Sequence, residues 1–285
     1  VAVACPNTGE SISMVPGEEG KDLKNKGKAY TPSVYPGRMR WGEIHVWDRH
    51  GKLVHEDAFP GVGHMNGIGL DALDNLYVMA NGPRLIDGKP YDPTAADDLS
   101  ETVMKVKARG AKVLSGVGNI GVPLAGGAPT RPADFGGYPT GNSWVEGAEW
   151  FYGGVGYTGN AGWDGGGCRC WNARMCLDYF ARTFAPETRH FSFAVLDASG
   201  NLITRVGQYG NVDDGKPLES KGGPPSPRSI GGDEVGLFHA AYVGTLTDRR
   251  IFLADAGNAR ILSVKLGYHA EEKTELKNVA DQGKK

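Results

Sequence analysis

The sequence predicts an all-β fold in which antiparallel strand pairs recur along the chain, and three observations carry that prediction. Glycine supplies 44 of the 285 residues and proline 17, so glycine is at roughly twice its usual share, as expected for many short strands joined by tight turns. Apolar and polar residues alternate over short stretches, which is typical of half-buried strands. Finally, two different units of sequence occur more than once.

The first repeated unit is a strand, a D-x-x-G turn and a second strand. Segments 44–53 (IHVWDRHGKL) and 193–202 (FAVLDASGNL) align without a gap, and 104–114 contains a weaker copy. Asp and Gly favour a chain reversal, because an Asp side chain bonds nearby backbone groups and glycine adopts positive φ at little cost. We therefore expect hairpin turns at Asp48–Gly51 and Asp197–Gly200.

The second unit is more apolar and begins with a histidine. His64 opens one copy and His239 the other, and in both an aromatic strand residue, Tyr77 or Phe252, follows 13 residues later. The two units alternate, so apolar strand pairs are followed by amphipathic ones. That order is expected of propeller blades, whose inner strands are buried on both faces. The sequence thus predicts an all-β β-propeller of four-stranded antiparallel blades.

Two segments resemble the NHL repeat. RIFLADAGNARI at 250–261 is similar to the NHL signature, in which a strand ends in Ala-Asp and G-N-x-R-I opens the next strand. NGIGLD at 66–71 with NLYV at 75–78 is similar to the same inner strands and to gluconolactonase-type propellers. The resemblance covers residues 42–118 and 168–278. It implies the fold and leaves the function open, because propellers serve as enzymes and as passive binders alike.

The chain is expected to divide into an irregular segment at 1–41, a propeller at 42–278 and a flexible tail at 279–285. Long loop insertions are predicted at 119–142 and at 211–232, where the sequence GGPPSP disfavours regular structure.

The blade count is lower than the six blades usual in NHL proteins. Full blades fit 62–118, 168–208 and 235–278, an outer half-blade fits 42–59, and 140–158 reads as an irregular piece. The outer pair at 42–59 needs inner strands, and only Val1–Ala4 reads as a strand upstream of it. We expect the missing strands to come from an upstream part of the same precursor or from a partner chain, so that this chain does not close its ring alone.

Composition and motifs narrow the classes of function. The formal net charge of −2 and the lack of a reading motif give no reason to expect nucleic acid as a partner. The sequence has no P-loop, G-x-S-x-G elbow, H-E-x-x-H or dinucleotide fingerprint, which argues against the enzymes that use them. No apolar run approaches the roughly 20 residues that span a bilayer. The first residue is Val1 rather than Met, so we expect a processed protein or a fragment.

The cysteines suggest an oxidising, extracytoplasmic compartment, either periplasmic or extracellular. One or two disulfides are the first interpretation, and a thiolate metal site is the second. A bond between Cys168 and Cys170 is the least expected, because so short a loop strains disulfide geometry. The candidates for a disulfide are Cys5, Cys168, Cys170 and Cys176.

His64 and His239 are candidate metal ligands. Both begin a predicted innermost strand, so the two could meet near the channel of a propeller, and histidine is a common ligand. The resemblance to amidating-lyase propellers, which bind zinc with channel histidines, implies the same, and Cys170 is a candidate third ligand. Zinc, copper and calcium are all possible metals, and a structural role for both histidines in the channel wall is the alternative.

Oxygen ligands for calcium are a further possibility. The resemblance to gluconolactonase-like propellers implies such a role for Asn66, Asp71 and Asp178. For Asp71, Asp197 and Asp255 we favour a role as turn or cap residues.

The segment 144–157 is rich in aromatic residues and glycine, which suits stacking on a carbohydrate, contact with a peptide partner, or a packed loop that caps the propeller. Glu146 and Glu149 are spaced as a potential acid–base pair. The candidate binding residues are Trp144, Glu146, Glu149, Trp150, Tyr152, Tyr157 and Trp163.

Two hypotheses for function follow. The first is an extracytoplasmic binding or scaffold propeller that belongs to a larger protein or complex, and it rests on the incomplete blade count and the lack of a catalytic motif. The second is a metal-dependent lyase or hydrolase with its site at the channel around His64 and His239. Whether the chain is an enzyme is left open.

Overall fold

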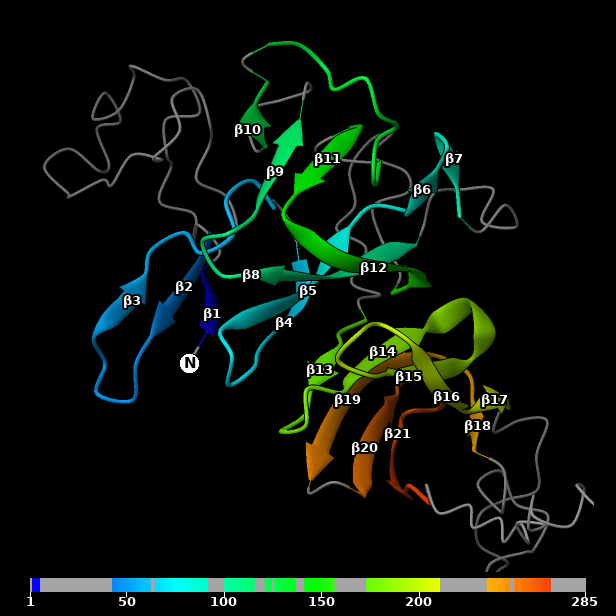
Figure 1. The fold of residues 1–285 in the computed structure, drawn as a ribbon. Coiled ribbons are helices and arrows are strands. Elements are labelled where there is room, and N and C mark those ends of the chain that lie inside the picture. Colours follow the sequence, from blue (N-terminus) through cyan, green and yellow to red (C-terminus); the bar gives the residue numbers. More distant parts are fainter. Residues whose placement is uncertain are drawn as a thin grey trace, which may run out of the picture.

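The computed structural model describes residues 2–5, 43–62, 65–91, 100–115, 121–124, 126–136, 141–156, 173–210, 235–246 and 249–267. Within these ranges the chain is all-β, as predicted (Figure 1), and its helical content consists of two single 3-10 turns, η1 (Thr188–His190) and η2 (Ala256–Asn258). The described part of the chain contains no helix long and apolar enough to cross a bilayer.

Four antiparallel sheets follow one another, and we number them by their place along the chain. Their strand orders are β1-β2-β3 in sheet 1, β12-β8-β5-β4 in sheet 2, β13-β14-β15-β16 in sheet 3 and β19-β20-β21 in sheet 4. The strands are β1 (Ala2–Cys5), β2 (Glu43–Trp47), β3 (Leu53–His55), β4 (Met65–Leu70), β5 (Asn75–Asn81), β8 (Glu101–Lys107), β12 (Ala148–Val155), β13 (Cys176–Leu177), β14 (Thr183–Glu187), β15 (Ser192–Leu196), β16 (Leu202–Val206), β19 (Ala240–Leu246), β20 (Arg250–Asp255) and β21 (Arg260–Lys265).

Shorter strands complete the described fold. They are β6 (Leu85–Ile86), β7 (Lys89–Pro90), β9 (Lys112–Ser115), β10 (Val122–Pro123), β11 (Ser143–Glu146), β17 (Gln208–Tyr209) and β18 (Gly236–Leu237).

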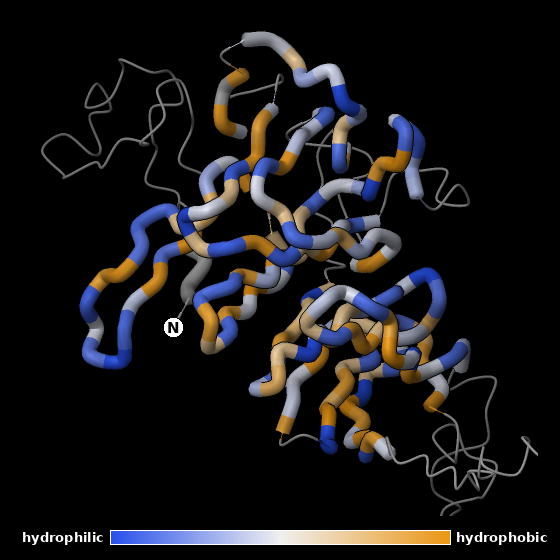
Figure 2. The backbone as a smooth tube through the Cα atoms, in the orientation of Figure 1, coloured by the Kyte–Doolittle hydropathy of each residue, from blue (hydrophilic) through white to orange (hydrophobic). Residues whose placement is uncertain are grey.

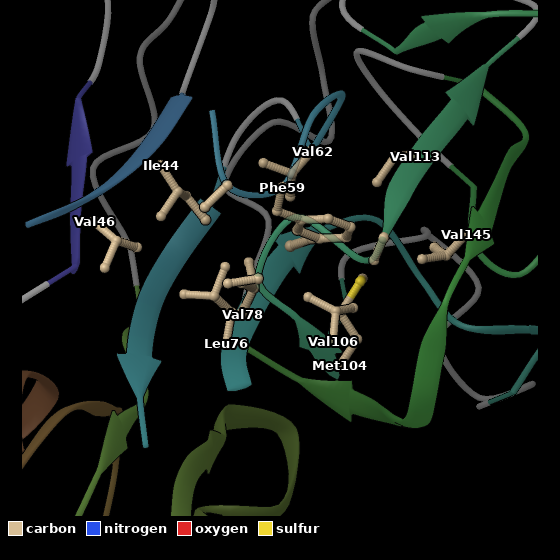
Figure 3. Packing of buried hydrophobic residues seen from close by; sticks show 14 of the residues in the cluster. Ile44, Val46, Phe59, Val62, Leu76, Val78, Met104, Val106, Val113 and Val145 are labelled. Carbon is tan, nitrogen blue, oxygen red and sulfur yellow. The ribbon is translucent and has the colours of Figure 1, made fainter. Parts of the chain in front are cut away.

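The hydrophobic core lies between consecutive sheets. In β5, Leu76 and Val78 belong to a cluster that includes Ile44 of sheet 1, whereas the alternate residues Tyr77 and Met79 pack toward sheet 3. Figure 3 shows the first of these clusters, and Figure 2 shows hydrophobic and hydrophilic residues alternating along the strands. A strand buried on both faces needs apolar residues at successive positions, which explains the run NLYVMA in β5.

A second such interface joins sheets 3 and 4. Phe184, Phe193 and Val195 of sheet 3 share a buried cluster with Ile251 and Leu253 of sheet 4. Sheets 2 and 3 are therefore packed on both faces.

The first strands of sheets 2, 3 and 4 lie side by side. The backbone N–H of Met175 donates to Asn66 O (3.2 Å), and that of Arg174 donates to Ala241 O (2.7 Å). Arg174 and Tyr242 form a parallel bridge. The sheets thus converge at their first strands, β4, β13 and β19 (Figure 1).

Glycines in β4 permit this close approach. A Cβ atom added at Gly67 would overlap the Met175 side chain, and one added at Gly69 would overlap Leu177. The NGIGL sequence of the predicted inner strand therefore provides a smooth surface for β13.

A single turn geometry recurs at four hairpins. In each turn the Asp Oδ1 accepts hydrogen bonds from the backbone N–H groups two and four residues later. The residue three positions after the Asp has a positive φ. The turns are Asp48–Lys52, Asp71–Asn75, Asp178–Arg182 and Asp197–Asn201. The two predicted D-x-x-G hairpins are confirmed and join the last two strands of sheets 1 and 3.

The structure corrects the predicted second blade at 62–118. Its fourth strand is β12, and the weak copy at 104–114 is not a hairpin, because β8 pairs with β12 while β9 pairs with β11. The chain forms a long two-stranded ribbon that bends opposite Gly147, which has a φ of 79°. The segment 140–158, expected to be irregular, thus contains two strands, and the expected loop at 119–142 contains β10.

The other unit boundaries agree in part. Sheet 3 matches the blade expected at 168–208, and β1 supplies the strand expected near Val1–Ala4 by pairing with β2. Sheet 4 has three strands within the described residues of the blade expected at 235–278. The expected loop at 211–232 and tail at 279–285 lie outside the described residues.

Replacing Gly69 by Ala should lower the free energy of unfolding by about 1–3 kcal/mol, the usual cost of overpacking a tight contact. Gly244→Ala in β19 is the matched control, because a Cβ at Gly244 meets no atom within 4 Å; it should be neutral or slightly stabilising. Denaturant unfolding of both variants measures the difference. Equal effects would contradict the proposed close packing of β4 on β13.

Candidate functional site

A cavity of about 240 Å³ opens between sheets 2 and 3. It lies where β12, the last strand of sheet 2, faces the end of β14 and the last strand of sheet 3, β16. The lining residues are Tyr91, Tyr152, Gly153, Gly154, Glu187, His190 and Arg205.

The Glu187 carboxylate organises the cavity. Its Oε1 accepts hydrogen bonds from Tyr152 Oη (2.8 Å) and Arg205 Nη2 (3.2 Å), and its Oε2 from Arg205 Nε (2.7 Å) and Ser192 Oγ (3.0 Å). Arg205 Nη2 also donates to Tyr152 Oη (3.2 Å). A side-on guanidinium–carboxylate pair with two further hydroxyl donors fixes all four groups.

The charges in this network are unequally accessible. The Glu187 side chain is 3% exposed, whereas that of Arg205 is 50% exposed. Hydrogen bonding to Glu187 raises the pKa of Arg205, so the guanidinium stays charged. A molecule entering the cavity therefore meets the cation more directly than the carboxylate.

Two glycines shape one wall. A Cβ at Gly153 would overlap Arg84 and come close to the ring of Tyr91, and Gly154 has a φ of 77°. Arg84 lies over the Phe151 ring, 4.5 Å from its centroid. The glycine-rich sequence of β12 thus lets the Tyr91 segment approach the strand.

The predicted aromatic binding segment is divided by the structure. Tyr152 lines the cavity. Trp150 packs on Gly200 and donates from Nε1 to Ala198 O (3.1 Å), so it joins sheets 2 and 3. Trp144 is buried, with Nε1 donating to Arg131 O (3.0 Å). Tyr157 and Trp163 lie outside the described residues.

Glu146 and Glu149 each have a lysine partner. Glu146 pairs with Lys112 (3.0 Å) and Glu149 with Lys105 (2.7 Å). The two glutamates lie on either side of the ribbon bend at Gly147. Their role as an acid–base pair stays a prediction.

The described residues do not bring the proposed metal ligands together. His239 directly precedes β19, its backbone N–H donates to Asp255 Oδ1 (3.0 Å), and burial lowers its pKa. His64 and Cys170 lie outside the described residues. Within the described part of the chain, no three His, Cys, Asp or Glu side chains gather as a metal site would require.

The carboxylates considered for calcium serve the turns. Asp71 and Asp178 each hold a hairpin through Oδ1, and Asp178 also pairs with Arg182 (2.6 Å). The side chain of Asn66 donates to Glu101. These oxygens are used within the fold, which supports the turn interpretation.

Cys176 is a free thiol in β13, and the disulfide expected among the four cysteines stays a prediction. Burial raises its pKa to about 12, which keeps it protonated. Cys168 lies outside the described residues, as does the side chain of Cys5.

Sheet 4 presents a second candidate surface, which we call the terminal apolar face. Its residues point away from sheet 3 at alternate positions of the three strands, and all are substantially exposed, with Ile261 at 75%. The face consists of Tyr242, Leu246, Phe252 and Ile261. Arg250 and Lys265 adjoin Leu246 at one end.

Sequence reasoning missed Tyr91, Glu187, His190 and Arg205. One signal for Glu187 was available, because it occupies the place in sheet 3 that Asp255 occupies in sheet 4. Both acids end the second strand, precede a 3-10 turn, and are followed four residues later by a residue with positive φ.

No family model matches the chain, and no curated protein matches its sequence.

Tyr152→Phe should flatten the loss of stability at alkaline pH. Burial, then the charge of Glu187, raises the pKa of Tyr152, so the folded state favours the protonated hydroxyl. That contribution is complete below the unfolded pKa of about 10 and disappears as the pH rises through the higher folded value. Unfolding free energies measured between pH 9 and 11 should fall less steeply in the variant than in the wild type.

The same variant should be less stable at pH 7 by about 1 kcal/mol, because Glu187 loses a donor. Tyr179→Phe, at a 94% exposed turn residue, is the control and should leave stability at pH 7 unchanged. Parallel pH profiles for wild type and Tyr152→Phe would contradict the assignment.

Proposed function

We propose that this protein is a β-propeller-type binding module that packs the terminal apolar face of sheet 4 against a β-sheet of another polypeptide. The exposure of Tyr242, Leu246, Phe252 and Ile261 on one face of a three-stranded sheet carries the proposal. Soluble proteins rarely expose contiguous apolar patches unless another surface covers them.

The stacking of the sheets supports the propeller interpretation. Sheets 1 to 4 pack face to face in chain order, and a parallel bridge between Arg174 and Tyr242 joins sheets 3 and 4 where they begin. A series of sheets stacked in this way is expected of a propeller. The NHL-like segment 250–261 forms β20, η2 and the start of β21, in agreement with the strand–turn–strand of that repeat.

The form of the terminal apolar face favours a sheet as its partner. The other face of sheet 4 packs on sheet 3 through Ile251 and Leu253. These residues alternate along β20 with the exposed ones, just as the residues of β5 alternate between two interfaces. A partner with an apolar sheet would continue the series, and acidic groups on its rim would meet Arg250 and Lys265.

Light scattering coupled to size-exclusion chromatography tests the proposal on the full chain. Without its partner, the exposed face should make the wild-type chain associate with itself at high concentration. The double variant Phe252→Glu/Ile261→Glu should abolish that association, because charges on the face oppose burial. Both residues are exposed, so circular dichroism should show an intact fold.

Leu73→Glu/Tyr179→Glu is the matched control, since both residues are exposed at turn tips of other sheets; it should associate like the wild type. A wild-type chain that stays monomeric up to high concentration, and binds an apolar dye no more than the Phe252→Glu/Ile261→Glu variant, would refute the proposal.

A further inference from the structure

We propose that the cavity between sheets 2 and 3 binds a single ring of a carboxylated sugar, of the uronic acid type. This site is separate from the terminal apolar face, and the inference does not depend on the function proposed for that face.

The size of the cavity sets the size of the ligand. At about 240 Å³ it is smaller than the roughly 300–1,000 Å³ of sites for drug-sized molecules. One ring, free or at the end of an oligosaccharide, is the group that fits.

The walls suit a sugar ring. Tyr91 is 56% exposed and lines the cavity, and Gly153 and Gly154 let its ring lie close to β12. Aromatic rings present apolar surface to the C–H face of a ring, while a tyrosine hydroxyl remains available for polar contact. Glu187 and Arg205 meanwhile hold Tyr152 in one orientation, which favours recognition by reducing the entropy lost on binding.

The accessible positive charge of Arg205 favours an acidic ligand. Four hydrogen bonds from Tyr152, Ser192 and Arg205 satisfy Glu187. Arg205 uses Nε and Nη2 for this network, and within the described residues its Nη1 has no hydrogen-bond partner. A guanidinium with free N–H groups, beside His190, recognises a carboxylate more strongly than a neutral hydroxyl.

A matched pair of probes isolates the carboxylate. Methyl β-glucuronide and methyl β-glucoside differ at one carbon substituent, and titration of the full chain followed by NMR chemical shifts gives both affinities. We expect the glucuronide to bind about tenfold more tightly, the lower end for a hydrogen bond to a charged group.

Two variants assign the parts of the site. Glu187→Gln/Arg205→Gln removes both charges together and so leaves no buried carboxylate unpaired; the preference for the glucuronide should fall to within about twofold. Tyr91→Ala should weaken both probes at least about fivefold. Tyr179→Ala, which removes an exposed tyrosine elsewhere, should change neither affinity.

Failure of both probes to bind, or equal affinities in the wild type, would overturn the proposal. So would a glucuronide preference that survives in Glu187→Gln/Arg205→Gln. Association through sheet 4 is measured separately by light scattering, so the failure of one proposal leaves the other distinguishable.

Discussion

The fold depends on sheets that are buried on both faces. Because β5 must fill the interface with sheet 1 and the interface with sheet 3, successive residues such as Tyr77 and Val78 serve different cores. A shift of register by one residue would exchange these two sets of side chains, so the register is strongly specified. The same requirement explains why outer strands such as β3 and β16, covered less completely, read as amphipathic.

Contacts between sheets 2 and 3 frame the cavity. The glycines of β4 bring the two sheets together at their first strands. Trp150 packs beside the Asp197–Asn201 turn, and Lys105 donates to Ala198 O (3.2 Å) there. Just past the end of β12, the backbone N–H of Gly156 donates to Pro186 O (2.6 Å). The cavity lies beside Tyr152, between these last two sets of contacts.

Composition and repeats predicted the class of fold, because turns and strands depend on residues close together in the sequence. The Asp-turn hairpins at Asp48 and Asp197 were predictable, since Asp and Gly specify a turn within five residues. The turn at Asp178–Arg182 has the same geometry but contains Ala181 at a φ of 59°, so its sequence lacks the glycine signal. Strand partners were harder to predict. The paired strands β8 and β12 are separated by 40 residues, and the sequence of neither strand indicates which strand it pairs with.

The site was harder still to predict, because its residues come from four separate segments. Tyr152 stood out within an aromatic stretch, whereas Tyr91 and Arg205 are isolated in the sequence and meet only through the stacking of sheets 2 and 3. Glu187 is buried, and a buried glutamate needs hydrogen-bond partners for its charge. Its likeness to Asp255 is the one signal that points to this position. Asp255 also pairs with an arginine, Arg260, but that arginine lies directly opposite it on the neighbouring strand, β21.

That difference shows how one structural position serves two purposes. Asp255 accepts hydrogen bonds from the backbone of Phe238 and His239 and from the side chain of Asn258. Its carboxylate therefore holds the segment before β19 against the η2 turn. Glu187, one methylene longer, instead extends to Arg205 on the fourth strand of sheet 3, a strand for which sheet 4 has no counterpart in the described residues. The fourth strand therefore creates the polar wall of the cavity in sheet 3. In sheet 4 Asp255 builds no such wall, and the exposed apolar residues of that sheet lie on the face that points away from sheet 3.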